Sequence, residues 1–174
     1  NQRMDSRIGD IRSPEVVAAA VAEIRPDIVF HLAAQPLVRR SYRNPVETYE
    51  TNVMGTVNVL EACRNVDSVK AAVVVTSDKA YENPETGVPL TEDRPLGGRD
   101  PYSSSKGAAE LVTAAYRSSF FSREGSALVA SARAGNVIGA GDESEDRLFP
   151  DIVRAIRGDF PIVVRNPSAT RPWQ

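Results

Sequence analysis

The sequence is poor in the residues that build metal centres and crosslinks. Its 174 residues include one cysteine, Cys63, and one histidine, His31. A single cysteine excludes an intrachain disulfide and a cysteine-built metal site, and a single histidine argues against a multi-histidine site. We therefore expect no metal in this chain. We interpret Cys63 as a helix-packing residue, and His31 as a buried core histidine rather than a catalytic group.

An excess of charge and a long apolar run are lacking as well. The formal net charge is −2 at pH 7, which gives no electrostatic case for binding nucleic acid or an acidic membrane surface. No apolar run approaches the roughly 20 residues of a membrane span. These absences predict a cytoplasmic protein without a nucleic-acid or membrane partner. The length suffices for one domain with its own core.

Both ends resemble the interior of a longer protein. The chain opens on "NQRMDSRIGDIRS", without an initiator methionine, and stops on "RNPSATRPWQ". We therefore expect an internal fragment of a larger chain, forming a single partial domain over residues 1–174.

Helical and strand-like patterns alternate along the chain. Capping residues, proline positions and apolar spacing predict helices at 14–25, 44–66, 101–123 and 147–158. Short apolar runs predict buried strands at 27–34, 69–78, from 126 onward, and at 160–164, and a Pro- and Gly-rich loop lies at 82–100. This alternation implies an α/β fold with a parallel sheet covered on both faces. Ligands bind beyond the carboxyl ends of such strands, where this chain carries "HLAAQ", "TSDKAY" and "ARAGNVIG".

The stretch "DPYSSSKGAAEL" (100–111) places a phenol and an ammonium four residues apart. Residues i and i+4 share one face of a helix, so Tyr102 and Lys106 project side by side. A nearby ammonium favours the phenolate and lowers a tyrosine pKa, which suits a general acid or base. The same spacing also fits an ordinary surface pair, and it does not by itself decide between the two.

The preceding strand ends in Thr76, Ser77 and Asp78, where a hydroxyl could hydrogen-bond a substrate oxygen that faces Tyr102. Asn52 lies inside the helix predicted at 44–66, where asparagine is mildly unfavourable. It has two interpretations, a buried polar role or a solvent-facing side chain.

Several motifs together resemble one family. The segments "HLAAQ", "NVMGT", "VVVTSDKAY", "YSSSK" and "RAGNVIGAGD" follow the order and spacing of the extended short-chain dehydrogenase/reductases. Longer segments, "HLAAQPLVRRSY", "PLGGRDPYSSSKGAAELV" and "RNPSATRPWQ", resemble the CDP-glucose 4,6-dehydratase branch. The resemblance covers nearly all of the chain. It implies a Rossmann-like fold and a nucleotide-sugar 4,6-dehydratase that holds NAD tightly.

The resemblance assigns roles to five catalytic residues. Tyr102 would take the proton of the sugar 4-hydroxyl while a hydride leaves C4 for NAD, and Lys106 would hold the nicotinamide ribose. Ser77 would bind the 4-oxygen. Asp78 would protonate the departing 6-hydroxyl as water is lost across C5–C6 and the hydride returns to C6. Lys79 stands where dTDP-glucose relatives have a glutamate base. It would remove the C5 proton or stabilise the enolate, and its structural alternative is an ion pair with a neighbouring carboxylate.

The resemblance also assigns binding residues. The cofactor residues implied by it are Asp10, Ile11, Leu32, Ala33, Ala34, Gln35 and Thr76, together with Tyr102 and Lys106. The substrate residues implied by it are Ser77, Asn136, Arg147 and Leu148. An arginine suits a pyrophosphate because it is a forked donor, although Arg147 would equally suit a solvated helix end.

The chain departs from the family pattern in one respect. The glycine-rich turn that seats the pyrophosphate is absent, since "GNVIGAG" (135–141) lacks the G-x-G-x-x-G spacing. The resemblance places that turn upstream of residue 1 and the base-binding part beyond Gln174. We therefore expect an incomplete Rossmann-like, doubly wound parallel sheet, with 140–174 entering the substrate-binding part.

Three alternatives remain open from sequence. A nucleotide-sugar 4-epimerase would share Tyr102, Lys106 and the hydroxyl of Ser77, but it has no use for the acid and base of "SDK" at 77–79. A non-catalytic NAD-binding module would keep the fold without turnover. The long helices at 44–66 and 101–123 could form a homodimer contact or serve core packing.

Overall fold

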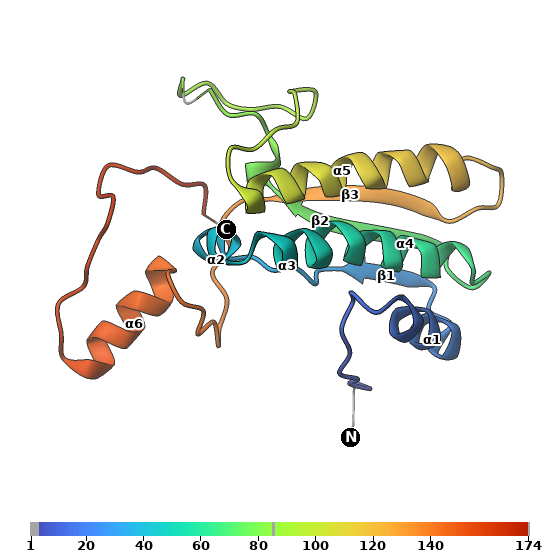
Figure 1. Cartoon of the computed structure of the whole chain (residues 1–174), viewed down its shortest axis with the longest axis horizontal. Helices are drawn as coiled ribbons and strands as arrows, with labels where there is room; N and C mark the ends of the chain where they lie inside the picture. Colours follow the sequence, from blue (N-terminus) through green and yellow to red (C-terminus); the bar gives the residue numbers. More distant parts are fainter. Residues whose placement is uncertain (1–3, 85, 174) are drawn as a thin grey trace. The chain divides into compact units, whose positions relative to one another are not determined.

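A computed structural model describes residues 4–84 and 86–173 (Figure 1). The chain divides into two compact units, residues 1–133 and residues 134–174. The first unit holds the sheet. Its strands are β1 (Ile28–His31), β2 (Ala71–Ser77) and β3 (Leu128–Ala134), in the order β1-β2-β3. The register of β1 on β2 is parallel, with His31 opposite Val74.

Five α-helices accompany the sheet within the described residues of the first unit. Helix α1 (Pro14–Ile24) precedes β1, and α5 (Pro101–Phe120) connects β2 to β3. The connection from β1 to β2 holds α2 (Val38–Arg43), α3 (Pro45–Tyr49), the π-helix η1 (Glu50–Met54) and α4 (Gly55–Arg64). The single-turn 3₁₀ helix η2 (Asp78–Ala80) follows β2 directly. The structure therefore confirms the α/β class and the parallel, Rossmann-like sheet.

The apolar core lies between one face of the sheet and the helices. Val74 and Val129 from the strands meet Leu60 and Cys63 of α4, and Val21 of α1 packs against the same cluster. Both crossovers step in the same direction across the sheet, and right-handed crossovers of one direction place their helices on one face. Helices α1, α4 and α5 of the first unit consequently form one layer against the sheet.

The other face of the sheet is not covered within the described residues. Phe30 of β1 is 64% exposed and Leu128 of β3 is 77% exposed, and exposure alternates along both strands. The prediction of strands buried on both faces is therefore wrong for β1 and β3. Their apolar residues are divided between the helix layer and an open face, as expected for strands with one covered face.

Two sequence predictions need further correction. The helix predicted at 44–66 is not one regular helix, because its hydrogen-bond pattern changes through η1. The short helix α2 before it was not predicted. The segment 160–164 is not a strand. It carries Pro161, which lacks a backbone donor, and its apolar residues are exposed, with Val163 at 77%.

The second unit holds α6 (Leu148–Gly158), which agrees with the helix predicted at 147–158. Within this unit Asn136 and Trp173 form an isolated parallel bridge. The predicted loop at 82–100 is irregular over its described residues, and Glu85 lies outside them. No helix within the described ranges is both long enough and apolar enough to span a membrane.

Candidate active site

The start of α5 is fixed from two sides. Asp100 is its N-cap, and the carboxylate of Asp100 accepts a hydrogen bond from the backbone N–H of Ser103 at 2.9 Å. Pro101 occupies the first helical position, where the missing N–H costs nothing. The hydroxyl of Ser41 in α2 accepts the N–H of Tyr102 at 3.1 Å. The short helix missed from sequence thus orients the turn that carries Tyr102.

Tyr102 and Lys106 are both buried, at 8% and 7% exposure. The surface-pair interpretation of this spacing is therefore wrong. The Lys106 ammonium donates from Nζ to the carbonyl oxygen of Val75 at 3.2 Å. Burial lowers the pKa of Lys106 to about 8, and the charge of Glu110 opposes that fall. The lysine consequently lies against the end of β2, on the same helix face as the tyrosine.

Three predicted catalytic residues form one tight turn at the end of β2. Ser77 caps η2, since its Oγ accepts the N–H of Lys79 at 3.2 Å, and the same hydroxyl donates to Oδ1 of Asp78 at 3.0 Å. Ser77 is buried, while Asp78 and Lys79 are half-buried. A carboxyl group, an amino group and a hydroxyl group thus lie within a single turn, beyond the carboxyl end of a strand.

The turn at η2 packs closely on α5. A Cβ at Gly107 would lie 3.4 Å from the carbonyl oxygen of Ala80 and 3.0 Å from that of Gly97. The absence of a side chain next to Lys106 therefore lets the backbone of η2 approach the helix. This contact brings residues 77–79 alongside the helix segment that carries Tyr102 and Lys106.

A buried polar layer supports the loop after β1. Asn52 of η1 accepts the N–H of Gln35 at 2.8 Å and donates from Nδ2 to the carbonyl oxygen of Gln35 at 3.1 Å. The same Nδ2 donates to Oγ of Ser105 at 2.8 Å, and Ser105 donates to the carbonyl oxygen of Tyr102. Asn52 therefore has the buried polar role and not the solvent-facing one. It ties the segment 32–35 to α5.

The predicted cofactor residues after β1 divide into two kinds. Leu32 and Ala33 are exposed, and Ala34 is half-buried. The Gln35 side chain is buried, donating from Nε2 to Thr48 Oγ1 at 2.9 Å and accepting the N–H of Leu37 at 2.7 Å. The alanines at 33 and 34 thus leave the backbone accessible. The buried side chain of Gln35 holds this segment in place through its hydrogen bonds.

The segment that carries Asp10 and Ile11 is tied to α4. Asn58 donates from Nδ2 to the carbonyl oxygen of Ile11 at 2.8 Å. Hydrogen bonds from Arg12 lower the pKa of Asp10 to about 2, so this exposed carboxylate is charged. A Cβ at Gly55 would lie 2.4 Å from Cδ1 of Ile11. The glycine of "NVMGT" therefore makes room for this segment.

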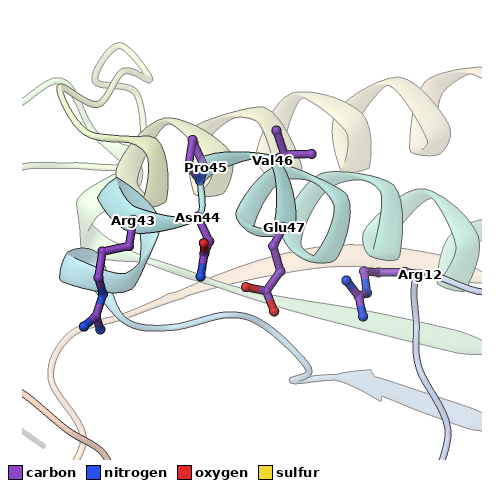
Figure 2. A pocket seen from close by; sticks show the side chains of 6 residues that line it. All are labelled: Arg12, Arg43, Asn44, Pro45, Val46 and Glu47. Carbon is purple, nitrogen blue, oxygen red and sulfur yellow. The ribbon is translucent and has the colours of Figure 1, made fainter.

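Figure 2 shows an open pocket beside this segment. Its lining residues are Arg12, Arg43, Asn44, Pro45, Val46 and Glu47. The guanidinium of Arg12 faces the carboxylates of Asp10 and Glu50, at 2.5 and 3.8 Å. The lining combines both signs of charge and includes none of the five predicted catalytic residues.

Sequence reasoning missed a buried carboxylate beside the site, Glu110. It is buried on α5, one turn after Lys106, and Thr76 donates to its carboxylate. The signal was present, because a glutamate four residues after Lys106 falls on the same helix face. Thr76 itself, a predicted cofactor residue, is buried and uses its hydroxyl in this bond.

Two other residues agree with their predicted roles. His31 is buried, with Nε2 3.1 Å from Thr56 Oγ1. Burial and the charge of Lys106 lower the pKa of His31 to about 4, so the imidazole is neutral at physiological pH. Cys63 is buried in the core, and burial raises the pKa of its thiol to about 11.

The predicted substrate residues beyond Ser77 belong to the second unit. Arg147 is the N-cap residue of α6, and its Nη1 donates to Asp142 Oδ2 at 3.2 Å. Leu148 is exposed at the first position of α6, and the N–H of Asn136 donates to the carbonyl oxygen of Pro172 at 2.9 Å. Their substrate roles remain predictions.

Comparison with known proteins identifies relatives across the whole chain. The family model described as GDP-mannose 4,6 dehydratase matches residues 1–171. The chain is 53% identical over 178 aligned positions to a CDP-glucose 4,6-dehydratase of Salmonella typhimurium, covering all of this chain and 50% of that protein. It is 33% identical over 156 positions to a UDP-glucose 4-epimerase of Lactobacillus helveticus, covering 87% of this chain and 46% of that protein. The chain thus spans about half the length of these relatives.

Solved structures show the same fold. A dTDP-glucose 4,6-dehydratase from Streptomyces venezuelae, with NAD and TYD bound, superposes with a TM-score of 0.85 at 28% identity, over 99% of this chain and 51% of that one. A UDP-glucose 4-epimerase from Thermus thermophilus in complex with NAD superposes with a TM-score of 0.80 at 30% identity, over 95% of this chain and 54% of that one. Dehydratases and epimerases therefore share this architecture.

Proposed function

Because this chain belongs to the GDP-mannose 4,6 dehydratase family, we propose that it carries the proton-transfer machinery of an NAD-dependent nucleotide-sugar 4,6-dehydratase. One observation supports this most strongly. The turn with Ser77, Asp78 and Lys79 packs on the helix segment that carries buried Tyr102 and Lys106.

The residues at the strand ends fit NAD. The small side chains of Ala33 and Ala34 leave room for a ligand at the carboxyl edge of the sheet, where dinucleotides bind in such folds. Lys106 lies at the same edge through its contact with Val75. When bound, NAD supplies the acceptor and donor of hydride. The residues proposed to contact it are Asp10, Ile11, Leu32, Ala33, Ala34, Gln35, Thr76, Tyr102 and Lys106.

The protein groups then move protons at three positions of the sugar. The ammonium of Lys106 favours the phenolate of Tyr102, which accepts the proton of the 4-hydroxyl. The Ser77 hydroxyl hydrogen-bonds the 4-oxygen. A ketone at C4 acidifies the C5 hydrogen, so a proton can leave C5 while the 6-hydroxyl departs as water with a proton from Asp78.

Lys79 is the candidate partner at C5. A lysine acts as a base only when its ammonium has lost its proton, and it otherwise stabilises an enolate by charge. Both roles use the half-buried position of Lys79 on η2. A pH profile of Lys79→Gln and Lys79→Arg separates them, because arginine retains the charge and cannot act as a base near neutral pH.

We take CDP-glucose as the proposed substrate, supported by the 53% identity to the Salmonella typhimurium enzyme. A 4-epimerase is the second candidate, supported by the epimerase relatives. The acid and base on η2 favour dehydration. A non-catalytic NAD-binding module is a third possibility. We also propose that residues 140–174 enter the substrate-binding part, with Asn136, Arg147 and Leu148 as substrate contacts. The proposed location of the protein is the cytoplasm.

A homodimer through the long helices is the proposed assembly. Apolar side chains of these helices are exposed within the chain, namely Val46, Met54 and Leu111. A pair of such faces would remove them from water. Sedimentation of the full-length protein and of Leu111→Glu tests this proposal, and a monomer in both samples would refute it.

The function is tested on the full-length protein that contains this chain, incubated with CDP-glucose and NAD. The 4-keto sugar is followed by its absorbance in alkali. Tyr102→Phe should lower turnover by about 10²–10⁴-fold, and Tyr42→Phe, on an exposed tyrosine of α2, should leave it unchanged. An epimerised sugar without keto product would favour the epimerase. NAD binding without turnover of any nucleotide sugar would favour the binding module.

A further inference from the structure

Glu110 is a carboxylate of α5 that is buried among polar partners from two strands. It accepts hydrogen bonds from Thr76 Oγ1 on β2, from Ser131 Oγ at 2.7 Å, and from Arg133 Nη2 at 3.0 Å on β3. Burial works against its charge, but these bonds outweigh burial and hold the pKa of Glu110 below its usual value. The carboxylate is therefore ionised and joins α5 to the ends of two strands.

The same network reaches the catalytic turn. The guanidinium of Arg133 lies over the ring of Tyr81, 4.7 Å from its centroid, and its Nη1 donates to the carbonyl oxygen of Glu92 at 3.1 Å. Tyr81 directly follows η2. Glu110 thus holds a guanidinium that packs against Tyr81, two residues after Lys79.

Glu110 also stands one helical turn from Lys106, on the same face of α5. The charged or titratable groups around Lys106 are Tyr102 and Glu110 on its own helix, His31 on β1, and Arg133 on β3 beyond Glu110. His31 is neutral and Arg133 is cationic. Glu110 is therefore the carboxylate among these groups that favours the charged form of Lys106.

We propose that Glu110 is a positioning residue of the active site, which keeps Lys106 an ammonium and aligns the turn at 77–81 through Arg133. Without Glu110, no carboxylate among these groups would offset the cost of burying the Lys106 ammonium. The proposal rests on the proposed function for its effect on turnover, but its effect on Lys106 is independent of turnover.

The decisive substitution is Glu110→Gln in the full-length protein, which keeps the shape and removes the charge. Without the carboxylate, the pKa of Lys106 should fall by about one unit, because a charge one helical turn away is worth on the order of one pH unit at a partly buried site. Activity that needs the Lys106 ammonium falls as pH rises through that pKa. The basic limb of the pH–rate profile should consequently move about one unit lower.

Lysine side-chain NMR of protein labelled at lysine measures the titration directly, with Lys106→Arg to assign the signal. In Glu110→Asp the pKa of Lys106 should stay close to its value in the unmodified protein, since aspartate retains the charge. Glu61→Gln, on an exposed carboxylate paired with Arg64, should leave it unchanged. A folded Glu110→Gln protein with unmoved titration and unmoved pH profile would overturn the proposal. A moved titration in a protein that turns over no nucleotide sugar would retain this inference and reject the proposed function.

Discussion

Replacing Asn52 by alanine should lower the free energy of unfolding more than replacing any other asparagine within residues 44–66. The Asn52 side chain makes three hydrogen bonds, two with the backbone of Gln35 and one with Ser105. A net contribution of about 1 kcal/mol per bond gives about 3 kcal/mol, and the buried N–H and carbonyl of Gln35 left without partners raise the loss to about 3–5 kcal/mol.

Asn58→Ala is the matched control. Asn58 lies on α4, less than two turns further on, and it is also buried, yet it makes one described side-chain bond, to the carbonyl oxygen of Ile11. Its loss should cost about 1 kcal/mol. Urea unfolding of the full-length protein measures both free energies, and an unchanged denaturant slope shows that the same unfolding is compared. A cost for Asn52→Ala no larger than that for Asn58→Ala would refute the reasoning.

Two further predictions concern pH and backbone conformation. Burial lowers the pKa of His31 to about 4 in the folded protein, so its unfolded form binds protons first as pH falls. The contribution of neutral His31 to the free energy of unfolding should be fully present above about pH 6.5. It should decrease by up to about 3 kcal/mol between pH 6.5 and 4. His31→Gln should flatten that decrease in acid unfolding curves. Gly98 has φ +145, and a Cβ there would lie 2.4 Å from the backbone N of Ser104. Gly98→Ala should therefore shift the start of α5, costing more stability than Gly125→Ala and lowering turnover.

Each of these has a clear opposite result. An acid unfolding curve that His31→Gln leaves unchanged between pH 6.5 and 4 would mean that this imidazole is accessible to protons in the folded state. Gly125 has φ +81 with nothing within 4 Å of a built Cβ, so alanine there meets only conformational strain of about 1 kcal/mol. Equal decreases in melting temperature for Gly98→Ala and Gly125→Ala would show that the loop before α5 can shift at little cost in stability.

The helices with local start signals were predictable. Pro14 and Pro101 stand at first helical positions, and α1 and α5 begin there. The break within 44–66 was not, because the change to π-type bonds at η1 depends on the partners that Asn52 finds in Gln35 and Ser105. Those partners are distant in sequence. The segment 160–164 failed for a related reason, since an apolar run becomes a strand only where a neighbouring strand pairs with it.

The residues of the candidate site were predictable from the sequence, but the contacts that hold them in place were not. The spacing of Tyr102 and Lys106 and the cluster at 77–79 were visible as patterns. The burial of the pair was not visible in the sequence, nor were the hydrogen bonds of Glu110 to β2 and β3. Ser41 gave no signal, because its bond to the N–H of Tyr102 joins residues 61 positions apart.

The sequence by itself determined the helices that have local start signals and the chemistry that each strand end carries, because capping and i,i+4 spacing are local properties of the chain. Only the tertiary structure decided that Tyr102 and Lys106 are buried, that Asn52 ties the loop 32–35 to α5, and that Glu110 joins Lys106 to β2 and β3. These features depend on desolvation and on hydrogen bonds between distant residues. Such forces act only once the parallel strands have brought their carboxyl ends together.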